Sequence, residues 1–484
     1  MRLLYYTTLL GVTIFLLGFI SIGHFVKRDD TDPFSYNIPY ASATTEDATT
    51  DDATTDTDVS LKPQASDQPI ITDSSLEVEQ VAEGLQLPTT MAFLGPNDIL
   101  VLEKDKGIVQ RIIDGKILPE PLLDVNVANK NERGMLGIAV VNKNNNNNNN
   151  NDNNNKNGPT NTVKPTYVFL YYTESSDATD GDDGCSKISK TCNPSSPLPT
   201  GNRLYRYELV GDKLVNPILL LDLPAVPGPA HNGGAISIGP DNNVYIPIGD
   251  VRGNDPQTSQ SLDGRGGILR VTQNGEAVGG GGNIGILGNE DPLDKYYAYG
   301  IRNSFGLDFD PITGKLWDTE NGPGFGDEVN LVEPGFNSGW KQIMGVASLD
   351  PGFDPEADLE NFDGKGIYSD PEFTWSNTPG PTGIKFLNSD KLGTQYQNDI
   401  FVGDFHNGNL YHFKLNKDRT GLALDGPLAD TIANDDTELS TAIFGNGFGG
   451  ITDIEVGPDG YLYVVSIGLG KIFKIVPKLN NETE

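Results

Sequence analysis

The sequence predicts an all-β chain that folds as a six-bladed β-propeller, and a repeated phrase carries this prediction. The phrase has an alternating apolar strand, a turn of Gly, Pro, Asp or Asn, and a second alternating strand. Such turn residues tolerate or pre-set the backbone angles of a tight reversal. Hairpin units that recur along one chain are typical of propeller blades. The full phrase occurs at residues 91–112, 235–250, 306–322 and 453–475, and two further units, at 137–209 and 383–415, lack the sharp turn.

Composition favours a single large domain of short strands. The 484 residues include 57 glycines and 32 prolines, which suits many turns. No long segment outside the N-terminus has the apolar period of a helix. We therefore expect the propeller to span residues 76–478, with a short tail at 479–484. An asparagine-rich run within it predicts a low-complexity surface loop at 142–162.

The N-terminus predicts a membrane anchor and a disordered stalk. Residues 3–26 are an almost unbroken apolar run, long enough to cross a bilayer, so residues 1–28 are expected to be an uncleaved signal-anchor. A cleaved signal peptide is the alternative. Residues 29–75 are rich in Thr, Asp, Ala and Ser and lack the apolar content of a core, which predicts a disordered linker.

Cysteine usage and charge indicate the compartment and the partners. Cys185 and Cys192 are the only cysteines, and their spacing in a polar loop suggests a local disulfide made in an oxidising compartment. We therefore expect the propeller to lie outside the cytoplasm. The net charge of −33 disfavours nucleic acid and anionic membrane surfaces as partners, and its simplest meaning is solubility.

Two polar clusters stand at predicted strand entrances. His231 precedes the strand in "HNGGAISIGPDNNVYIPIGD", and Asp250 ends the same phrase, where its carboxylate could fix the tautomer of His231. A lone His is more often structural, so its neighbours decide the interpretation. Arg302 and Asn303 precede another strand and could bind an anion or polarise a carbonyl. An inter-blade salt bridge is the alternative role for Arg302.

A third cluster, "DTENGPGFGDEVNLVEPGFNSGW" at 318–340, predicts a calcium loop. Its glycines and Pro323 could turn backbone carbonyls and carboxylates towards one point, the oxygen-rich setting that calcium prefers. The spacing does not match an EF-hand. The oxygen-bearing side chains in it are Glu320, Asn321, Asp327, Glu328 and Asn330.

Together these phrases resemble the glucose/sorbosone dehydrogenase family, the soluble quinoprotein aldose sugar dehydrogenases. The resemblance covers about residues 78–477 and includes "ERGMLGIAV", "YAYGIRNSFGLDFDPITGKLWDTENGPGFGDEVN" and "GITDIEVGPDGYLYVVS". It implies a six-bladed propeller with pyrroloquinoline quinone (PQQ) and calcium at the channel mouth. The implied reaction oxidises an aldose at the anomeric carbon to the lactone, and an external acceptor takes the electrons.

The resemblance also implies roles for individual residues. His231 matches the general base, Asp250 the acid that supports it, and Arg302 the cation beside the quinone oxygens. Asn303 follows Arg302 as in the family, and Glu132 stands where a Gln is frequent, which is a loose match. The cofactor-binding residues implied are Arg302, Asn303, Glu132 and His406. The calcium would be held at Gly322, Pro323 and Asp327.

The chain departs from the family pattern on the side that would hold the carboxylates of PQQ. His406 stands where a Lys is frequent, and Gly450 and Thr452 stand where two arginines are frequent. This loss of cations favours a second hypothesis, a non-catalytic surface propeller that binds carbohydrate or protein. A third is a calcium-dependent lactonase or other hydrolase, since one fold serves many functions.

Substrate choice is expected to depend on the long loop at 344–381. Tyr368, Phe373 and Trp375 in this loop could stack on a sugar ring or be buried against the blades.

Overall fold

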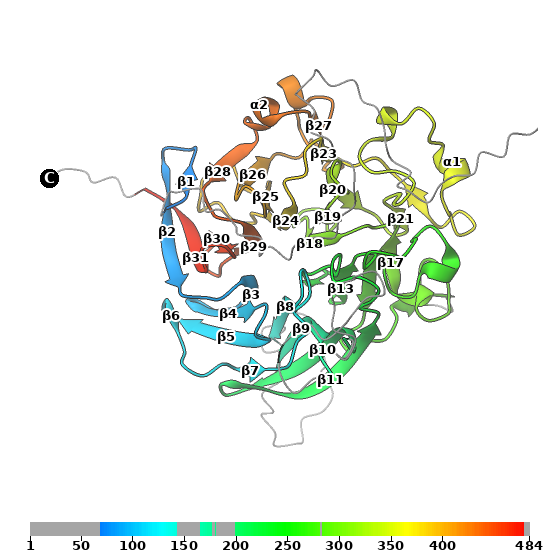
Figure 1. Cartoon of the computed structure of the whole chain (residues 1–484). Helices are drawn as coiled ribbons and strands as arrows, with labels where there is room; N and C mark the ends of the chain where they lie inside the picture. Colours follow the sequence, from blue (N-terminus) through cyan, green and yellow to red (C-terminus); the bar gives the residue numbers. More distant parts are fainter. Residues whose placement is uncertain (1–67, 143–164, 177–179, 181–198, 281–282, 479–484) are drawn as a thin grey trace, which may run out of the picture. The chain divides into compact units, whose positions relative to one another are not determined.

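The described part of the chain is a ring of β-sheets around a central axis (Figure 1). In the computed structural model the described residues are 68–142, 165–176, 180, 199–280 and 283–478. They all lie within one compact unit. These residues form six sheets of four to six strands and one two-stranded sheet. The β-propeller prediction is confirmed.

The N-terminal half of the ring contains three of the large sheets. The first has β3 (Pro88–Gly95), β4 (Asp98–Glu103), β5 (Ile108–Ile113), β6 (Lys116–Ile117) and β7 (Leu123–Asp124). The second has β8 (Met135–Asn142), β9 (Thr166–Glu174), β10 (Gly201–Val210) and β11 (Lys213–Leu223). The third has β12 (Ser237–Ile238), β13 (Val244–Ile248), β14 (Gly267–Val271), β17 (Tyr296–Tyr299), β21 (Phe336–Asn337) and β22 (Ile367–Tyr368). The two-stranded sheet pairs β15 (Gly279–Gly280) with β16 (Asn283–Ile284).

The C-terminal half contains the other three large sheets. The fourth has β18 (Ser304–Phe309), β19 (Leu316–Glu320), β20 (Asp327–Val332), β23 (Phe373–Trp375) and β27 (Ile432–Ala433). The fifth has β24 (Pro381–Phe386), β25 (Ile400–Asp404), β26 (Leu410–Phe413), β28 (Ile443–Asn446) and β1 (Ile70–Ile71). The sixth has β29 (Ile451–Val456), β30 (Leu462–Ser466), β31 (Lys471–Pro477) and β2 (Leu76–Glu83).

Helices contribute little to the described fold. The α-helices are single turns, α1 (Pro355–Asp358) and α2 (Asp436–Leu439). The 3-10 turns are η2 (Ser259–Ser261), η3 (Leu293–Lys295), η4 (Ala347–Leu349) and η5 (Gly426–Leu428). Among the described residues no helix has the length and apolar character to cross a membrane. The predicted anchor at 1–28, the pair Cys185 and Cys192, and nearly all of the asparagine-rich loop lie outside the described residues.

Each large sheet turns its first strand towards the axis, and neighbouring first strands contact one another. The contacts run β3 to β8, β8 to β12, β12 to β18, β18 to β24, β24 to β29, and from β29 back to β3. Figure 1 shows β3, β8, β18, β24 and β29 near the centre of the ring. The ring therefore closes upon itself, and the first strands line its axis.

The N-terminal strands complete sheets that are otherwise built from the C-terminus. β2 pairs antiparallel with β31, the last strand of the chain. β1 pairs with β28, with Ile70 opposite Asn446. We expected a disordered linker up to residue 75, and this boundary is wrong at its C-terminal end. The apolar pair Ile70–Ile71 joins the edge of the fifth sheet, where Ile71 is buried.

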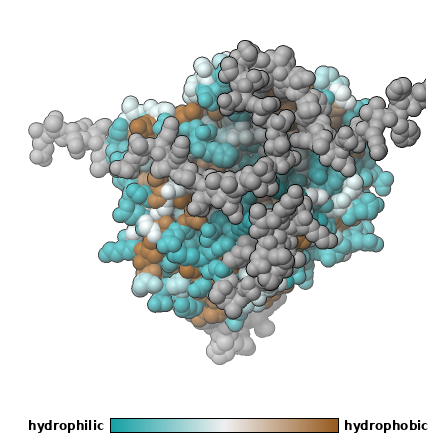
Figure 2. Space-filling view, viewed as in Figure 1, coloured by the Kyte–Doolittle hydropathy of each residue, from teal (hydrophilic) through white to brown (hydrophobic). Residues whose placement is uncertain are grey.

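The core lies between neighbouring sheets and absorbs the large aromatic side chains. Trp317, Trp375 and Phe373 are at most 1% exposed and pack in one cluster between the fourth and fifth sheets. Of the two roles considered for Phe373 and Trp375, burial against the blades is therefore the one the structure supports. Tyr368 is partly exposed, and its hydroxyl donates to Asp370. On the side seen in Figure 2, hydrophilic residues cover most of the visible described surface.

Candidate functional site

Antiparallel topology brings most of the predicted site residues to one end of the ring. The start of a first strand and the end of the second strand lie at the same edge of an antiparallel sheet. Glu132 precedes β8, His231 precedes β12 and Arg302 precedes β18, each a first strand. Asp250 follows β13 and Asn321 follows β19, each a second strand. One rule of topology thus collects residues that lie almost 200 positions apart in sequence.

His231 and Asp250 form a buried pair. The Nδ1 of His231 lies 2.6 Å from Oδ1 of Asp250, and the two residues are 6% and 2% exposed. Burial alone would raise the pKa of Asp250, but hydrogen bonds from His231, Trp340 and the Arg252 amide outweigh burial and lower it. An ionised Asp250 accepts a hydrogen bond from the Nδ1–H of His231, so Nε2 is the nitrogen of His231 left to act as a base.

The carboxylate of Glu132 joins three strand entrances. Its Oε2 accepts the backbone N–H of His231 at 2.7 Å and the side-chain amide of Asn303 at 3.2 Å. Glu132 therefore holds the entrances of the second, third and fourth sheets together. It was predicted as a cofactor-binding residue from a loose match, and the hydrogen bonds give it a supporting position beside His231.

The guanidinium of Arg302 is held on one side and has an unpaired donor. Nη1 donates to the carbonyl of Asn321 at 2.6 Å, and the backbone amide donates to Glu320 at 2.6 Å. Its Nε, and Oδ1 of Asn303, are buried with no hydrogen-bond partner among the described residues. A buried polar group without a partner is costly, so each is a place for a ligand atom. The cationic donor fits an anionic or quinone oxygen, and the acceptor fits an N–H or O–H group of the same ligand.

The backbone at this site is strained and leaves no room for larger residues. His231 has φ of +62°, a left-handed conformation that costs a non-glycine residue about 1–3 kcal/mol. Gly249 lies between the backbones of His231 and Arg302, because a Cβ there would stand 2.5 Å from the first carbonyl oxygen and 2.7 Å from the second. The close approach of the two strand entrances therefore requires glycine at 249.

The predicted calcium loop is shorter than expected. Residues 322–326 form the loop, but Glu320, Asp327, Glu328 and Asn330 belong to the buried strands β19 and β20. The two carboxylate oxygens of Asp327 accept the amides of Gly322 at 2.7 Å and Gly380 at 2.8 Å. Asp327 thus fastens the loop. No hydrogen bond between described residues ends on the carbonyls of Gly322 or Pro323, so these oxygens fit a hard cation.

Carboxyl groups of β19 and β20 gather behind the loop. Glu320 lies opposite Glu328 in the strand register, and Asp318 lies opposite Asn330. Burial raises the pKa of Asp318 to about 7, and burial together with Asp318 raises that of Glu320 to about 8. Burial and the neighbouring Glu320 raise the pKa of Glu328 as well. Among the described residues no set of three or more His, Cys, Asp or Glu side chains is arranged to hold a metal ion.

The positions that lack the expected cations have different surroundings. His406 is exposed, and its ring lies against Gly380 and hydrogen-bonds the carbonyl of Thr378 at 3.0 Å. Gly450 has φ of +87°, and a Cβ there would stand 3.0 Å from a backbone oxygen. Thr452 is 4% exposed, and its hydroxyl donates to the Pro88 carbonyl. Only His406 offers space for a long cationic side chain.

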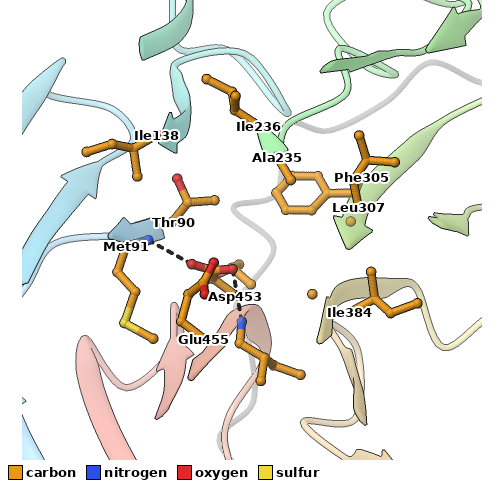
Figure 3. A pocket seen from close by; sticks show the side chains of 14 residues that line it. Thr90, Met91, Ile138, Ala235, Ile236, Phe305, Leu307, Ile384, Asp453 and Glu455 are labelled. Atoms are coloured by element: carbon orange, nitrogen blue, oxygen red, sulfur yellow. Dashed lines mark hydrogen bonds between the residues drawn. The ribbon is translucent and has the colours of Figure 1, made fainter. Parts of the chain in front are cut away.

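A small cavity lies on the axis, away from the His231–Asp250 pair. Figure 3 shows Thr90, Ile138, Phe305, Ile384 and Asp453 converging on it from five first strands. Its volume is about 20 Å³, room for about one water molecule. None of the predicted catalytic, cofactor-binding or calcium-binding residues lines this cavity. Thr452, one of the positions where the family often has an arginine, does line it. We place the candidate site at the strand entrances because a cavity with room for about one water molecule cannot hold an organic ligand.

Trp340 belongs to the site but was missed by the sequence analysis. Its indole N–H donates to Oδ2 of Asp250 at 2.9 Å, and its ring lies 5.4 Å from the guanidinium carbon of Arg302. The signal that could have found it is its position at the end of the 318–340 phrase, directly after "GFNSG". The contact itself depends on how the third sheet folds back towards Asp250.

Comparisons with known proteins agree over most of the chain. A model of the family described as Glucose / Sorbosone dehydrogenase matches residues 85–474. Aldose sugar dehydrogenase YliI of Escherichia coli is 25% identical over 409 residues, which cover 84% of this chain and 94% of that protein. Two solved structures share the fold. An oxidoreductase (glucose dehydrogenase) from Thermus thermophilus has a TM-score of 0.57 at 27% identity and covers 83% of this chain and 100% of its own. The PQQ-bound aldose sugar dehydrogenase of Streptomyces coelicolor has a TM-score of 0.56 at 22% identity, with coverage of 83% and 98%.

Proposed function

The chain belongs to the glucose/sorbosone dehydrogenase family, and we propose that it is a PQQ- and calcium-dependent oxidoreductase that oxidises an aldose at the anomeric carbon to the lactone. The observation that carries the proposal is the buried His231–Asp250 pair beside the unpaired Nε of Arg302. PQQ, when bound, would supply the two-electron acceptor for the hydride of the sugar carbon. The substrate is a small sugar, and the electrons leave to an external acceptor.

His231 supplies the base of this reaction. Asp250 holds the Nδ1 proton of His231, so Nε2 takes the proton of the anomeric hydroxyl as the carbon–hydrogen bond breaks. The charged Asp250 then stabilises the imidazolium that forms. These roles of His231 and Asp250 require the pair to be shielded from bulk water, and both side chains are buried.

Arg302 and Asn303 are the residues proposed to hold the quinone group. Arg302 would place its Nε–H against a quinone oxygen and stabilise negative charge there. The Oδ1 of Asn303 would accept a hydrogen bond from the same ligand. Calcium would sit on the carbonyls of Gly322 and Pro323, which have no partner among the described residues, on a loop fastened by Asp327.

The test is titration of PQQ into the full-length protein with calcium, followed by sugar-dependent dye reduction. Binding that chelation of calcium weakens, together with dye reduction that His231→Ala abolishes, would support the proposal. Failure of the full-length protein to bind PQQ would contradict it. Product identification separates the lactone from other oxidation products.

A second candidate function is a non-catalytic surface propeller that binds carbohydrate or protein. The replacements at Gly450 and Thr452 favour it, because they leave Arg302 with less help in neutralising an acidic cofactor. Carbohydrate binding without PQQ binding would identify this function. Lactone hydrolysis in the presence of calcium would identify a hydrolase instead.

We also propose a location and a blade count. Residues 1–28 would anchor the protein in the membrane, with the propeller outside the cytoplasm, as the apolar run and the Cys185 and Cys192 pair suggest. Protease accessibility of the propeller on intact cells tests this topology. We count each of the six large sheets as one blade, and the closed run of contacts between first strands supports this count.

A further inference from the structure

Trp340 contacts both halves of the candidate site. Its indole N–H donates to Oδ2 of Asp250 at 2.9 Å, while Oδ1 of the same carboxylate meets His231 at 2.6 Å. The face of its ring lies 5.4 Å from the guanidinium carbon of Arg302, within the range of a cation–π contact. Among the described residues, Asp250 also accepts the backbone amide of Arg252 on Oδ1. The carboxylate therefore has donors on both oxygens, and one of them is the indole.

The loop around Trp340 is itself held in place. The Trp340 amide donates to the Gly300 carbonyl at 2.9 Å, and its carbonyl accepts from the Gln257 side chain at 3.0 Å. Gln257 and Asn337 exchange two further side-chain hydrogen bonds, of 2.7 and 2.9 Å. A side chain that is 9% exposed on such a loop has little freedom to turn. Its indole therefore presents a fixed N–H to Asp250.

We propose that Trp340 is a positioning residue of the sugar-oxidising site, which orients Asp250 through its indole N–H and Arg302 through its ring. The effect of Trp340 on the reaction rests on the proposed function, whereas its contacts with Asp250 and Arg302 do not depend on that function. With Oδ2 fixed by the indole, Oδ1 of Asp250 faces His231 and selects the tautomer in which Nε2 is free. The ring covers one face of the guanidinium, so the unpaired Nε of Arg302 keeps its direction.

Charged groups that face the pair come from several elements. Glu132 accepts the backbone amide of His231, Arg302 attracts Asp250, and Arg252 follows Asp250 in the chain. A substitution at Trp340 leaves these groups in place. Any change in the pH profile of the reaction would therefore report the missing indole contact.

The chain provides a matched control, since it contains three tryptophans. The indole N–H of Trp375 is buried without a partner among the described residues, and Trp375 packs in the core of the fourth and fifth sheets. Trp340→Phe and Trp375→Phe remove the same atoms, but only the first removes a hydrogen bond to Asp250. We expect Trp340→Phe to lower kcat about tenfold, the effect of losing a hydrogen bond to a charged group.

The pH profile separates positioning from general damage. Without the indole donor the ionised form of Asp250 is less stabilised, so the His231–Asp250 pair becomes protonated at a higher pH. The acid limb of the pH profile of kcat/KM should therefore shift to higher pH. Trp375→Phe should leave the limb where it is in the unaltered protein. Equal acid limbs in Trp340→Phe and the unaltered protein would overturn the proposal.

A second measurement, which needs neither cofactor nor sugar, tests the contact between Trp340 and Asp250 even if Trp340→Phe fails to fold. In protein labelled with nitrogen-15 at tryptophan, Asp250→Ala should shift the indole N–H resonance of Trp340 and speed its exchange with solvent. The resonances of Trp317 and Trp375 should stay unchanged. An unmoved Trp340 resonance would overturn the proposal. If the loaded enzyme oxidises no sugar, the proposed function fails, while this measurement still decides whether Trp340 holds Asp250.

Discussion

His231 and Asp250, nineteen residues apart, meet through a 2.6 Å hydrogen bond at the entrance of the third sheet. The contact exists because β12 and β13 form a hairpin, which returns the chain from the entrance of its first strand to the same edge. Both side chains are buried, so a carboxylate and an imidazole interact there with little screening by water.

The pair gives the most direct prediction about activity. Asp250→Asn leaves a side chain of similar shape but removes the charge that holds the Nδ1 proton, so kcat should fall by at least about a hundredfold. Steady-state dye reduction with an aldose measures this. His412→Gln is the control, because His412 forms a similar pair with Asp399 at 2.9 Å on an outer strand. Equal losses in the two variants would contradict the assignment of His231 as the base.

The close packing around Gly249 predicts that Gly249→Ala lowers both stability and activity. Gly249→Ala would place a methyl group 2.5 Å from the His231 carbonyl and 2.7 Å from the Arg302 carbonyl. The two entrances must then move apart, at a cost of about 1–3 kcal/mol in the free energy of unfolding and about a hundredfold in kcat. Denaturant unfolding and steady-state kinetics measure both. Gly95→Ala, where nothing lies within 4 Å of a Cβ, should change neither.

Asp318 predicts a pH dependence of stability. Burial raises its pKa to about 7, above the ordinary value of 3.8, and both of its oxygens lack hydrogen-bond partners among the described residues. The folded protein therefore holds the extra proton, so the contribution of Asp318 to stability is fully present below about pH 4 and is lost as the pH rises through about 7. Asp318→Asn removes this contribution, while those of Glu320 and Glu328 remain, and it should add about 1–2 kcal/mol of stability at pH 8.

Thermal unfolding between pH 4 and pH 8 in the presence of EDTA checks this prediction. Asp425→Asn at an exposed turn is the control and should follow the unaltered protein. A Tm profile of Asp318→Asn that parallels the unaltered protein across this range would show that Asp318 is ionised in the folded state.

The exposed position of His406 predicts that a lysine there would raise the affinity for PQQ. His406→Lys adds a fixed cation at an exposed position beside Gly380, and we expect PQQ to bind about fivefold more tightly, as for an exposed ion pair of about 1 kcal/mol. Calorimetric titration measures the affinity. Ile312→Lys adds the same charge at the turn between β18 and β19, which lies at the opposite edge of the sheet from Arg302, and should have no effect. Equal affinities for all three proteins would place the cofactor carboxylates elsewhere.

Arginine at Gly450 or Thr452 is expected to fail where His406→Lys succeeds. Gly450 has a positive φ, and Thr452 is buried with its hydroxyl bonded to Pro88. A long cationic side chain at either position would have to displace backbone or enter the axial cavity. Reduced stability without a gain in PQQ affinity is the expected result for Thr452→Arg.

Local sequence patterns were enough to predict the strands, the fold class and the polar residues at the strand entrances. All six predicted hairpin units are strands in the structure, from β3 to β31. Alternation and turn residues are local properties, so they can be read from neighbouring letters. The phrases that contain His231, Asp250 and Arg302 were also recognised as one family's site from their order along the chain.

Which of these residues contact one another, and which of them position other residues, became visible only in the folded ring. Asp327 fastens a loop, Glu132 joins three entrances, and Trp340 reaches Asp250 from ninety positions away. β1 and β2 likewise close sheets that the C-terminus builds. The physical reason is that these contacts form between segments brought together by ring closure. The period of hydrophobic residues specifies the face of each strand but not its partner in another sheet.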